Sequence, residues 1–235
     1  MSLKNAFFIT GTDTEIGKTT IACGLLAAAN YKQLMTAAVK PVASGCELTA
    51  QGLRNEDALA LWQQCTVTLD YSEINPVAFQ PAIAPHIAAI EAQQLLSVAT
   101  LLPKVISVLE KSADFTVIEG AGGWQVPLNK YEYLADLAKQ LKLPIILVVG
   151  IRLGCVNHAL LTKHAILAEG LTIAGWVANV IDPTMSRLKD NLETLQTHLN
   201  LPCLGHVPYL KQPNAQQVAS YLDITAILGA TNESK

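Results

Sequence analysis

Residues 11–20, with the sequence GTDTEIGKTT, have the composition of a loop that surrounds phosphate groups. Backbone N–H groups of such a loop bind anions where it enters the N-terminus of a helix, because they point at the ligand. Lys18 could reach the terminal phosphates, the Thr19 hydroxyl could ligate Mg²⁺, and Gly17 has no Cβ to obstruct the phosphates. The segment therefore predicts a site for a nucleoside triphosphate.

The loop departs from the strict phosphate-binding pattern by one residue. That pattern has four residues between its glycines, whereas five separate Gly11 from Gly17, and Thr12 stands at the first pattern position. Because Thr12 lacks the freedom of glycine to adopt a positive φ, we expect a wider loop. The alternative is a glycine-containing turn that binds nothing. The position of Lys18, where a strand meets a helix, favours the phosphate loop.

A second lysine ends the apolar residues 36–40 and is followed by the sequence PVASG. A lysine at the end of a buried strand is costly unless its ammonium meets anions. Lys40 could therefore lie near the transferred phosphate, with Ser44 touching a second substrate. The alternative is a lysine that covers the strand end with its aliphatic stem and keeps its charge in water. The residues alone leave both interpretations open.

Two carboxylates could hold the metal ion of a nucleotide. Glu119 ends an apolar run and precedes the sequence GAGG at residues 120–123. A carboxylate in this position beside a phosphate-loop strand often meets Mg²⁺, and the glycines let a ligand approach the backbone. Asp57 stands at the start of a predicted helix, with Asn55 as its N-cap. An acid there often only complements the helix dipole, and its position alone favours that interpretation.

A third group of residues could bind a carboxylate. Residues 154–158 (GCVNH) open a predicted helix whose free N–H groups could hold an anion, with Asn157 as either N-cap or ligand. No Ser/His/Asp or Cys/His arrangement suggests a protein nucleophile. The five cysteines are odd in number and form no C-x-x-C, so neither a disulfide framework nor a zinc site is indicated.

Alternating strands and helices must position these residues. Continuous apolar runs, typical of parallel strands covered on both faces, predict strands at 6–10, 36–40, 115–119, 145–150, 173–180 and 204–207. Helical spacing predicts helices at 18–30, 56–64, 92–110, 133–141, 157–169, 186–199 and 216–228. Pro103 could kink or split the third helix, and residues 70–85 are expected to be irregular.

We therefore predict one doubly wound α/β domain over residues 1–235, with a mainly parallel sheet flanked by helices and a loose tail. Ligands of such sheets gather at the carboxyl ends of the strands. The polar or glycine-rich segments expected at these ends are 11–19, 40–45, 119–124, 150–158, residue 179 and 208–209. The net charge of −3 without a basic block argues against a nucleic-acid partner. The longest apolar run is far too short to span a bilayer, and the N-terminus lacks the shape of a signal peptide. We expect a soluble cytoplasmic protein.

Six segments together resemble the dethiobiotin synthetase family. They are GTDTEIGKTT, KPVASG, LRNEDAL, VIEGAGGW, LGCVNHA and AGWVAN, which occur in the order and spacing of the family between about residues 7 and 213. The phosphate loop alone is shared with related ATPases and ligases, whereas the set of six is specific. The loop of the family also carries the extra residue between its glycines.

The resemblance implies a Mg·ATP-dependent ligase of biotin synthesis that makes dethiobiotin from 7,8-diaminononanoate and CO₂ and releases ADP and phosphate. One substrate amine captures CO₂ as a carbamate, which attacks the γ-phosphate. The second amine then displaces phosphate from the mixed anhydride and closes the ureido ring. This reaction needs positioning and charge neutralisation rather than a protein nucleophile. The family also implies a homodimer, with the substrate site at the interface.

The resemblance also implies roles for individual residues. The implied catalytic residues are Lys40, Lys18 and Thr14, and the implied metal ligands are Thr19, Asp57 and Glu119. The implied ATP-binding residues are Glu15, Ile16, Gly17, Lys18, Thr19, Thr20, Asp57, Glu119, Gly120, Ala121, Gly122, Asn179, Pro208, Tyr209 and Leu210. The implied substrate-binding residues are Thr14, Lys40, Ser44, Gly154, Cys155, Val156 and Asn157, of which the last four would serve the partner subunit.

Two other functions are compatible with the phosphate loop. A partitioning or switch ATPase usually has a second lysine near the start of this loop, where the present chain has Thr12 and Asp13. The amidation domain of a cofactor-building ligase is normally joined to a glutaminase domain, of which no sequence signal is found. A nucleotide-binding structural subunit would leave the polar strand ends unexplained.

Overall fold

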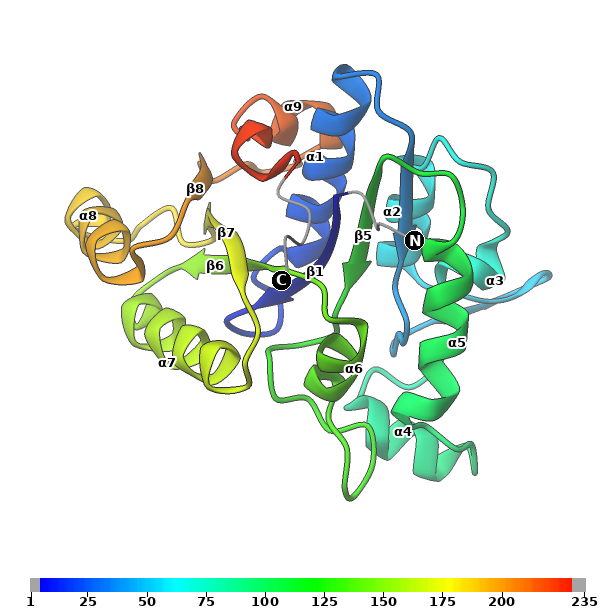
Figure 1. Ribbon diagram of the computed structural model, residues 1–235. Coiled ribbons are helices and arrows are strands. Elements are labelled where there is room, and N and C mark those ends of the chain that lie inside the picture. Colours follow the sequence, from blue (N-terminus) through cyan, green and yellow to red (C-terminus); the bar gives the residue numbers. More distant parts are fainter. Residues whose placement is uncertain (1–4, 230–235) are drawn as a thin grey trace.

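A parallel sheet of six strands forms the centre of the molecule. The computed structural model describes residues 5–229 (Figure 1). The strands lie in the order β2-β5-β1-β6-β7-β8, and every neighbouring pair is parallel. Their bounds are β1 Ala6–Gly11, β2 Thr36–Val39, β5 Phe115–Glu119, β6 Ile145–Ile151, β7 Ile173–Val180 and β8 Cys203–Val207. This confirms the predicted α/β fold and its six strands, within two residues at each end.

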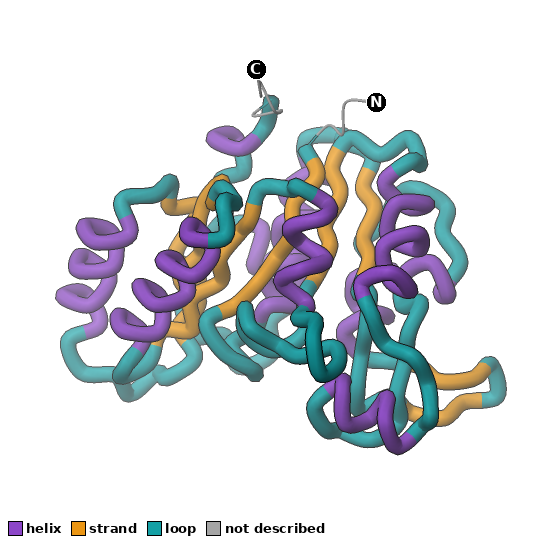
Figure 2. Tube along the Cα trace, turned by 60° about the horizontal axis from the view of Figure 1, so that its bottom comes forward, coloured by secondary structure: helices purple, strands orange, loops and turns teal. Residues whose placement is uncertain are grey.

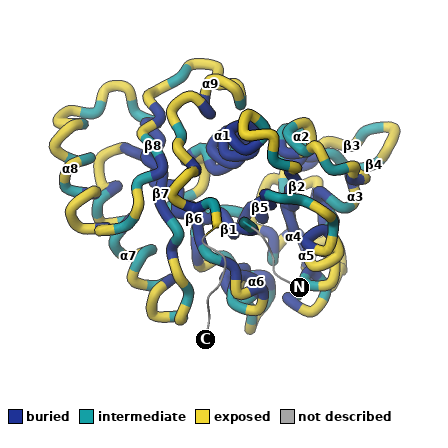
Figure 3. The backbone as a smooth tube through the Cα atoms, turned by 45° about the horizontal axis from the view of Figure 1, so that its top comes forward, coloured by how far each residue is buried: buried dark blue, intermediate teal, exposed yellow. Residues whose placement is uncertain are grey.

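Helices cover both faces of the sheet (Figure 2). Because successive side chains of a strand point to opposite faces, Phe7 and Ile9 pack with α1 and α9, whereas Ala6 and Phe8 pack into a separate apolar cluster with α5, α6 and α7. Figure 3 shows the resulting buried centre under exposed outer surfaces. The helices are α1 Lys18–Tyr31, α2 Glu56–Gln63, α3 Tyr71–Ile74, α4 Pro85–Glu91, α5 Val98–Leu109, α6 Leu134–Leu141, α7 Cys155–Ala168, α8 Leu188–Leu199, α9 Ala215–Ala219 and the 3-10 turn η1 Thr225–Ile227.

Two predicted helices were wrong in extent. The helix expected over 92–110 begins only at Val98, because Ser97 caps it by accepting the Thr100 N–H at 3.2 Å, and Pro103 does not split it. The helix expected over 216–228 ends at Ala219. The following residues turn back along β8 instead, where the Asp223 N–H donates to the Leu204 carbonyl at 2.8 Å.

The region between β2 and α5 contains structure that the sequence did not predict. A hairpin of β3 (Glu47–Thr49) and β4 (Gly52–Arg54) projects from the sheet, and the residues expected to be irregular contain α3 and the start of α4. The segment after α3 runs beside the loop that follows β2, and an isolated parallel bridge joins Ala43 to Ala78. None of the helices formed by residues 5–229 combines the length and apolar character needed to cross a bilayer.

Candidate active site

The phosphate loop joins β1 to α1 at the carboxyl edge of the sheet. Its left-handed backbone falls on Glu15, with φ 57°, and on Gly17, with φ 81°, rather than on Thr12. A threonine at the first pattern position therefore causes no backbone strain. A side chain at Gly17 is excluded a second time by space, since its Cβ would lie 2.3 Å from the Asn179 Nδ2 atom.

Lys18 is buried within this loop. Its Nζ atom donates to the Asp13 carbonyl oxygen at 2.9 Å, and only 7% of the residue is exposed. Burial lowers the pKa of Lys18, and the nearby Glu119 carboxylate offsets part of that effect. Asp13 in turn accepts the Thr14 N–H at 2.8 Å and pairs with the guanidinium of Arg152 beyond β6. The loop is thus held in shape by its own residues and by Arg152, with the Lys18 ammonium bound to the Asp13 carbonyl.

Four polar side chains from two strand ends and two helix starts meet beside Lys18. Lys40 follows β2, and its Nζ atom lies 2.6 Å from the Asp57 Oδ2 atom and 2.8 Å from the Glu119 Oε1 atom. The Thr19 hydroxyl donates to the same Glu119 oxygen at 2.7 Å. Lys40 is 5% exposed and Glu119 is 1% exposed. This contact with two carboxylates excludes the interpretation of Lys40 as a lysine with its charge in water.

Within this cluster, Lys40 and Asp57 keep each other ionised. Burial opposes the charged form of Lys40, but Glu119 and Asp57 outweigh it and raise the pKa of the ammonium above its usual value. Burial likewise opposes ionisation of Asp57, but Lys40 outweighs it and lowers the pKa of that carboxyl. Asp57 therefore does more than complement the dipole of α2.

The oxygen atoms of this cluster suit Mg²⁺. The Glu119 Oε2 atom is buried and has no hydrogen-bond partner among the described residues, while its other oxygen is shared by Lys40 and Thr19. An unpaired buried carboxylate oxygen is costly, so it is suited to a cation. Mg²⁺ prefers oxygen ligands and is usually held by one or two carboxylates, with phosphates and water completing its shell. Thr19, Asp57 and Glu119 supply such a set.

The cluster lines a cleft of about 820 Å³. Thr14, Gly122 and Ser44 also line it, and the buried Ser44 Oγ atom has no hydrogen-bond partner within residues 5–229. The other lining residues are mostly apolar and include residues 82–85, Val126 and Pro127. The cleft thus combines a charged part at the phosphate loop with apolar lining that could take a hydrocarbon chain.

A smaller pocket of about 200 Å³ lies on the other side of the phosphate loop. It shares Glu15, Gly17 and Thr20 with the cleft. Asn179, at the end of β7, donates from its Nδ2 atom to the Ile16 carbonyl at 2.8 Å. Its side-chain oxygen takes no part in this bond and can accept a hydrogen bond from a ligand. The remaining walls include Pro208, Tyr209 and Leu210 after β8.

Comparison with known proteins decides the family. A family model described as an AAA domain matches residues 5–217. An ATP-dependent dethiobiotin synthetase of Pseudomonas paraeruginosa is 62% identical, with 93% of this chain and 96% of the relative covered. A synthetase of Cellvibrio japonicus is 54% identical over 97% and 99% of the two chains, and one of Yersinia pestis is 46% identical over 97% of each. The chain belongs to the dethiobiotin synthetase family.

Solved structures confirm the fold of this dethiobiotin synthetase family member. A ParA family ATPase of Chlorobium tepidum matches with a TM-score of 0.56 at 10% identity, covering 92% of this chain and 98% of the other. The MinC:MinD cell division complex of Aquifex aeolicus matches with a TM-score of 0.56 at 13% identity, covering 94% and 87%. At such low identity the similarity concerns the sheet and its helices alone.

The structure brings most of the implied synthetase residues together, but one segment lies apart. The described residues that line the cleft and the smaller pocket do not include residues 154–157. Helix α7 begins at Cys155, with Gly154 as N-cap at φ 94°, so Asn157 is its third residue. The interpretation of Asn157 as an N-cap is therefore wrong, because the chain reaches helical geometry two residues earlier. A role for this segment across a dimer interface stays a prediction.

Sequence reasoning missed several residues of the synthetase cleft. Gln125 lines it and donates from its Nε2 atom to the Glu169 Oε1 atom at 2.6 Å. The apolar wall at residues 82–85 was not predicted either, because it belongs to the segment expected to be irregular. Asp13 holds Lys18 and Arg152, although the loop motif leaves its position open to any residue. No spacing rule singles out these residues, since their roles arise from contacts between distant segments.

Proposed function

We propose that the chain catalyses the Mg·ATP-dependent closure of the ureido ring of dethiobiotin from 7,8-diaminononanoate and CO₂, with release of ADP and phosphate. This is a step of biotin synthesis. The observation that carries the proposal is the buried cluster of Lys40, Glu119, Asp57 and Thr19 beside the phosphate loop. It occurs in a chain that is 62% identical to a dethiobiotin synthetase over nearly its whole length.

The residues of the cluster stabilise charge during phosphoryl transfer. One amine of the substrate takes up CO₂ as a carbamate, and a carbamate oxygen attacks the γ-phosphate of ATP. Lys18 leaves the Asp13 carbonyl to contact the phosphates, and Lys40 neutralises the negative charge that develops between carbamate and phosphate. The second amine then attacks the carbonyl carbon of the mixed anhydride and expels phosphate. The protein supplies position and charge and forms no covalent bond.

Thr19, Asp57 and Glu119 would hold Mg²⁺. The ion supplies positive charge that neutralises phosphate oxygens. Thr14 and Ser44 would contact the diamine and its carbamate, and Lys40 would lie between them and the phosphate. Residues 15–20 and 120–122 would surround the phosphates, while Asn179 and residues 208–210 would receive adenine in the smaller pocket.

The chain would act as a cytoplasmic homodimer. The diamine carries a carboxylate at the end opposite to its amines, and the described cations that line the cleft are only Lys18, in the phosphate loop, and Lys40, which is paired with carboxylates. In a dimer, residues 154–157 of the partner chain would bind that carboxylate through the N-terminus of α7, where backbone N–H groups are free. Analytical ultracentrifugation with and without the diamine tests this arrangement, and a monomer in both conditions would contradict it.

One assay tests the activity. The protein is incubated with Mg·ATP, bicarbonate and 7,8-diaminononanoate, and dethiobiotin is detected by its mass while ADP is counted. We expect one ADP for each dethiobiotin. ATP hydrolysis that ignores the diamine and yields no dethiobiotin would instead indicate a switch ATPase, whose fold this chain shares.

A further inference from the structure

Residues 70–81, expected from the sequence to be irregular, hold the loop that carries Lys40 and Ser44. The Lys40 N–H donates to the Ile74 carbonyl at 2.6 Å, and the Ala43 N–H donates to the Val77 carbonyl at 2.9 Å. Further along, the Gly45 N–H donates to the Pro81 carbonyl at 3.0 Å. Residues 74–81 therefore pair with the loop that follows β2, much as a further strand would pair with the edge strand β2.

A buried chain of hydrogen bonds joins this segment to the helix that carries Asp57. The Tyr71 hydroxyl accepts the Asn55 N–H at 2.7 Å and donates to the Asn75 Oδ1 atom at 3.4 Å. The Asn75 Nδ2 atom donates to the Lys40 carbonyl at 2.8 Å and to the Val77 carbonyl at 3.1 Å. Both carbonyls can only accept, so the orientation of this amide is fixed. Tyr71, Asn75 and Asn55 are each at most 7% exposed.

Asn55 connects this chain to Asp57. Its Oδ1 atom caps α2 by accepting the Ala58 N–H at 3.1 Å, and its Nδ2 atom donates to the Ser44 carbonyl at 3.4 Å. Asp57 lies two residues later, in the first turn of the same helix. The position of its carboxylate therefore depends on how Asn55 is held. The Arg54 guanidinium lies 4.1 Å from the centre of the Tyr71 ring, which holds the ring from the outside.

We propose that Tyr71 and Asn75 are positioning residues for the Lys40–Asp57 pair, and this proposal rests on the ligase function proposed above. The hydroxyl of Tyr71 is the only described side-chain link from Asn75, on the Lys40 side, to the backbone of Asn55, on the Asp57 side. Its removal leaves the buried Asn55 N–H and the Asn75 Oδ1 atom without partners. Asn55 must then shift to recover a hydrogen bond, and Asp57 moves with it.

The variant Tyr71→Phe tests the proposal, because it keeps the ring, its packing and its contact with Arg54. Tyr131→Phe is the matched control, since Tyr131 is 81% exposed and lies outside the cleft. We expect kcat for dethiobiotin formation to fall about tenfold in Tyr71→Phe, and the KM for Mg·ATP to rise no more than several-fold. The control keeps the wild-type kcat. Equal kcat values in Tyr71→Phe and the wild type would overturn the proposal.

A binding measurement separates positioning from a loss of stability. Calorimetry gives the affinity for a non-hydrolysable ATP analogue with and without Mg²⁺ at a temperature where all variants are folded. We expect the gain in affinity from Mg²⁺ to fall several-fold in Tyr71→Phe, while the affinity without Mg²⁺ stays unchanged. A lower melting temperature together with an unchanged gain from Mg²⁺ would show that Tyr71 serves only stability.

A double-mutant cycle identifies the route of the effect. If Tyr71 acts through Asp57, the double variant Tyr71→Phe/Asp57→Asn should show the same gain in nucleotide affinity from Mg²⁺ as Asp57→Asn alone. If instead the double variant loses the product of the two single-variant losses in this gain, the two residues act independently and the proposal is contradicted. Asn75→Ser should cause the same kind of loss and serves as a second probe. If the wild-type protein forms no dethiobiotin, the proposed function fails, while these calorimetric results still decide whether Tyr71 positions Asp57.

Discussion

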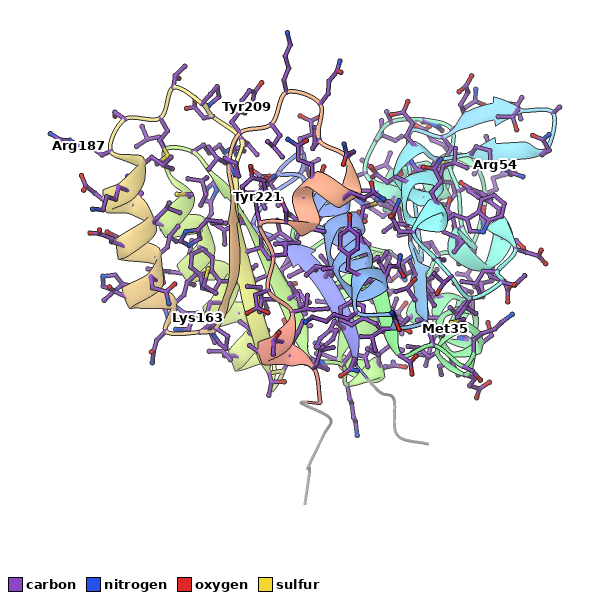
Figure 4. The ribbon with its side chains drawn as sticks, turned by 90° about the horizontal axis from the view of Figure 1, so that it is seen from above. Met35, Arg54, Lys163, Arg187, Tyr209 and Tyr221 are labelled. Atoms are coloured by element: carbon purple, nitrogen blue, oxygen red, sulfur yellow. The ribbon has the colours of Figure 1, made fainter. Side chains whose placement is uncertain are left out.

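The two flanks of the phosphate loop differ in chemistry although they belong to one sheet edge. On the β5 and β2 flank, the strands end in Glu119 and Lys40, which are buried and paired with each other. On the β6, β7 and β8 flank, Asn179 is the one buried polar side chain among the described strand ends that line the smaller pocket. In Figure 4, Arg54 of the β3–β4 hairpin lies toward the right of the view, and Tyr209, which follows β8, lies left of the centre.

The difference indicates a division of labour within the site. Buried charges destabilise a fold unless they are paired. The β5 and β2 flank, called the ionic flank below, therefore suits the part of the site where charge develops during a reaction. The β6, β7 and β8 flank is called the neutral flank. A neutral amide with apolar neighbours suits a planar base, which requires shape and a few hydrogen bonds. Substitutions on the ionic flank should therefore lower kcat, and substitutions on the neutral flank should raise the KM for ATP.

Lys40→Ala should have the largest effect. The substitution removes the ammonium that faces the developing negative charge, so we expect kcat to fall about 10²- to 10³-fold. It also leaves Glu119 buried without its cation, which lowers the free energy of unfolding by roughly 3–5 kcal/mol. Steady-state assays and thermal melts measure both effects. Lys189→Ala serves as the control, because the Lys189 side chain is 87% exposed. Equal kcat values in the two variants would show that Lys40 has no role in the reaction.

Glu119→Gln should rank second. Glutamine keeps the shape of the side chain and an oxygen for Thr19, but it lacks the negative charge that would hold Mg²⁺. We expect kcat to fall about 10²-fold and the Mg²⁺ concentration for half-maximal rate to rise about tenfold. A Mg²⁺ titration of the rate measures this. Glu193→Gln is the control, because Glu193 is 67% exposed on α8. An unchanged Mg²⁺ requirement would contradict the role of Glu119 as a ligand.

The ionic flank also shows what the sequence could and could not predict. Local patterns predict the roles of residues 11–20 and of Glu119, because a phosphate loop and a strand-end carboxylate can be recognised from a few consecutive residues. The residues around Lys40 left two interpretations of this lysine open. Its contacts with two carboxylates, which lie 17 and 79 positions away in the sequence, decide between them. Tyr71 and Asn75 gave no signal, since their roles depend on hydrogen bonds to distant backbone atoms. Contacts between remote segments have no period that a sequence pattern can detect.

Asn179→Ala should show the opposite kinetic split. Asn179 lies at the smaller pocket, where it would bind ATP equally well before and during the reaction. We expect the KM for ATP to rise about tenfold, with kcat within twofold of the wild type. Initial rates over a range of ATP concentrations at saturating diamine measure both constants. A large fall in kcat with an unchanged KM would end the distinction between the two flanks.

The smallest effect concerns the pH dependence of stability in Asp57→Asn. Burial opposes ionisation of Asp57, but Lys40 outweighs it and holds the pKa of the folded state below the usual 3.8. A depressed pKa stabilises the fold above the unfolded pKa, and this contribution is lost as the pH falls through the folded pKa. Thermal melts of both proteins should therefore differ by a few degrees at pH 7, and the difference should narrow only below pH 3.8, as the pH falls toward the folded pKa of Asp57. A difference that stays constant below pH 3.8, down to the lowest pH at which both proteins are folded, would mean that the Asp57 charge contributes nothing to the stability of the fold.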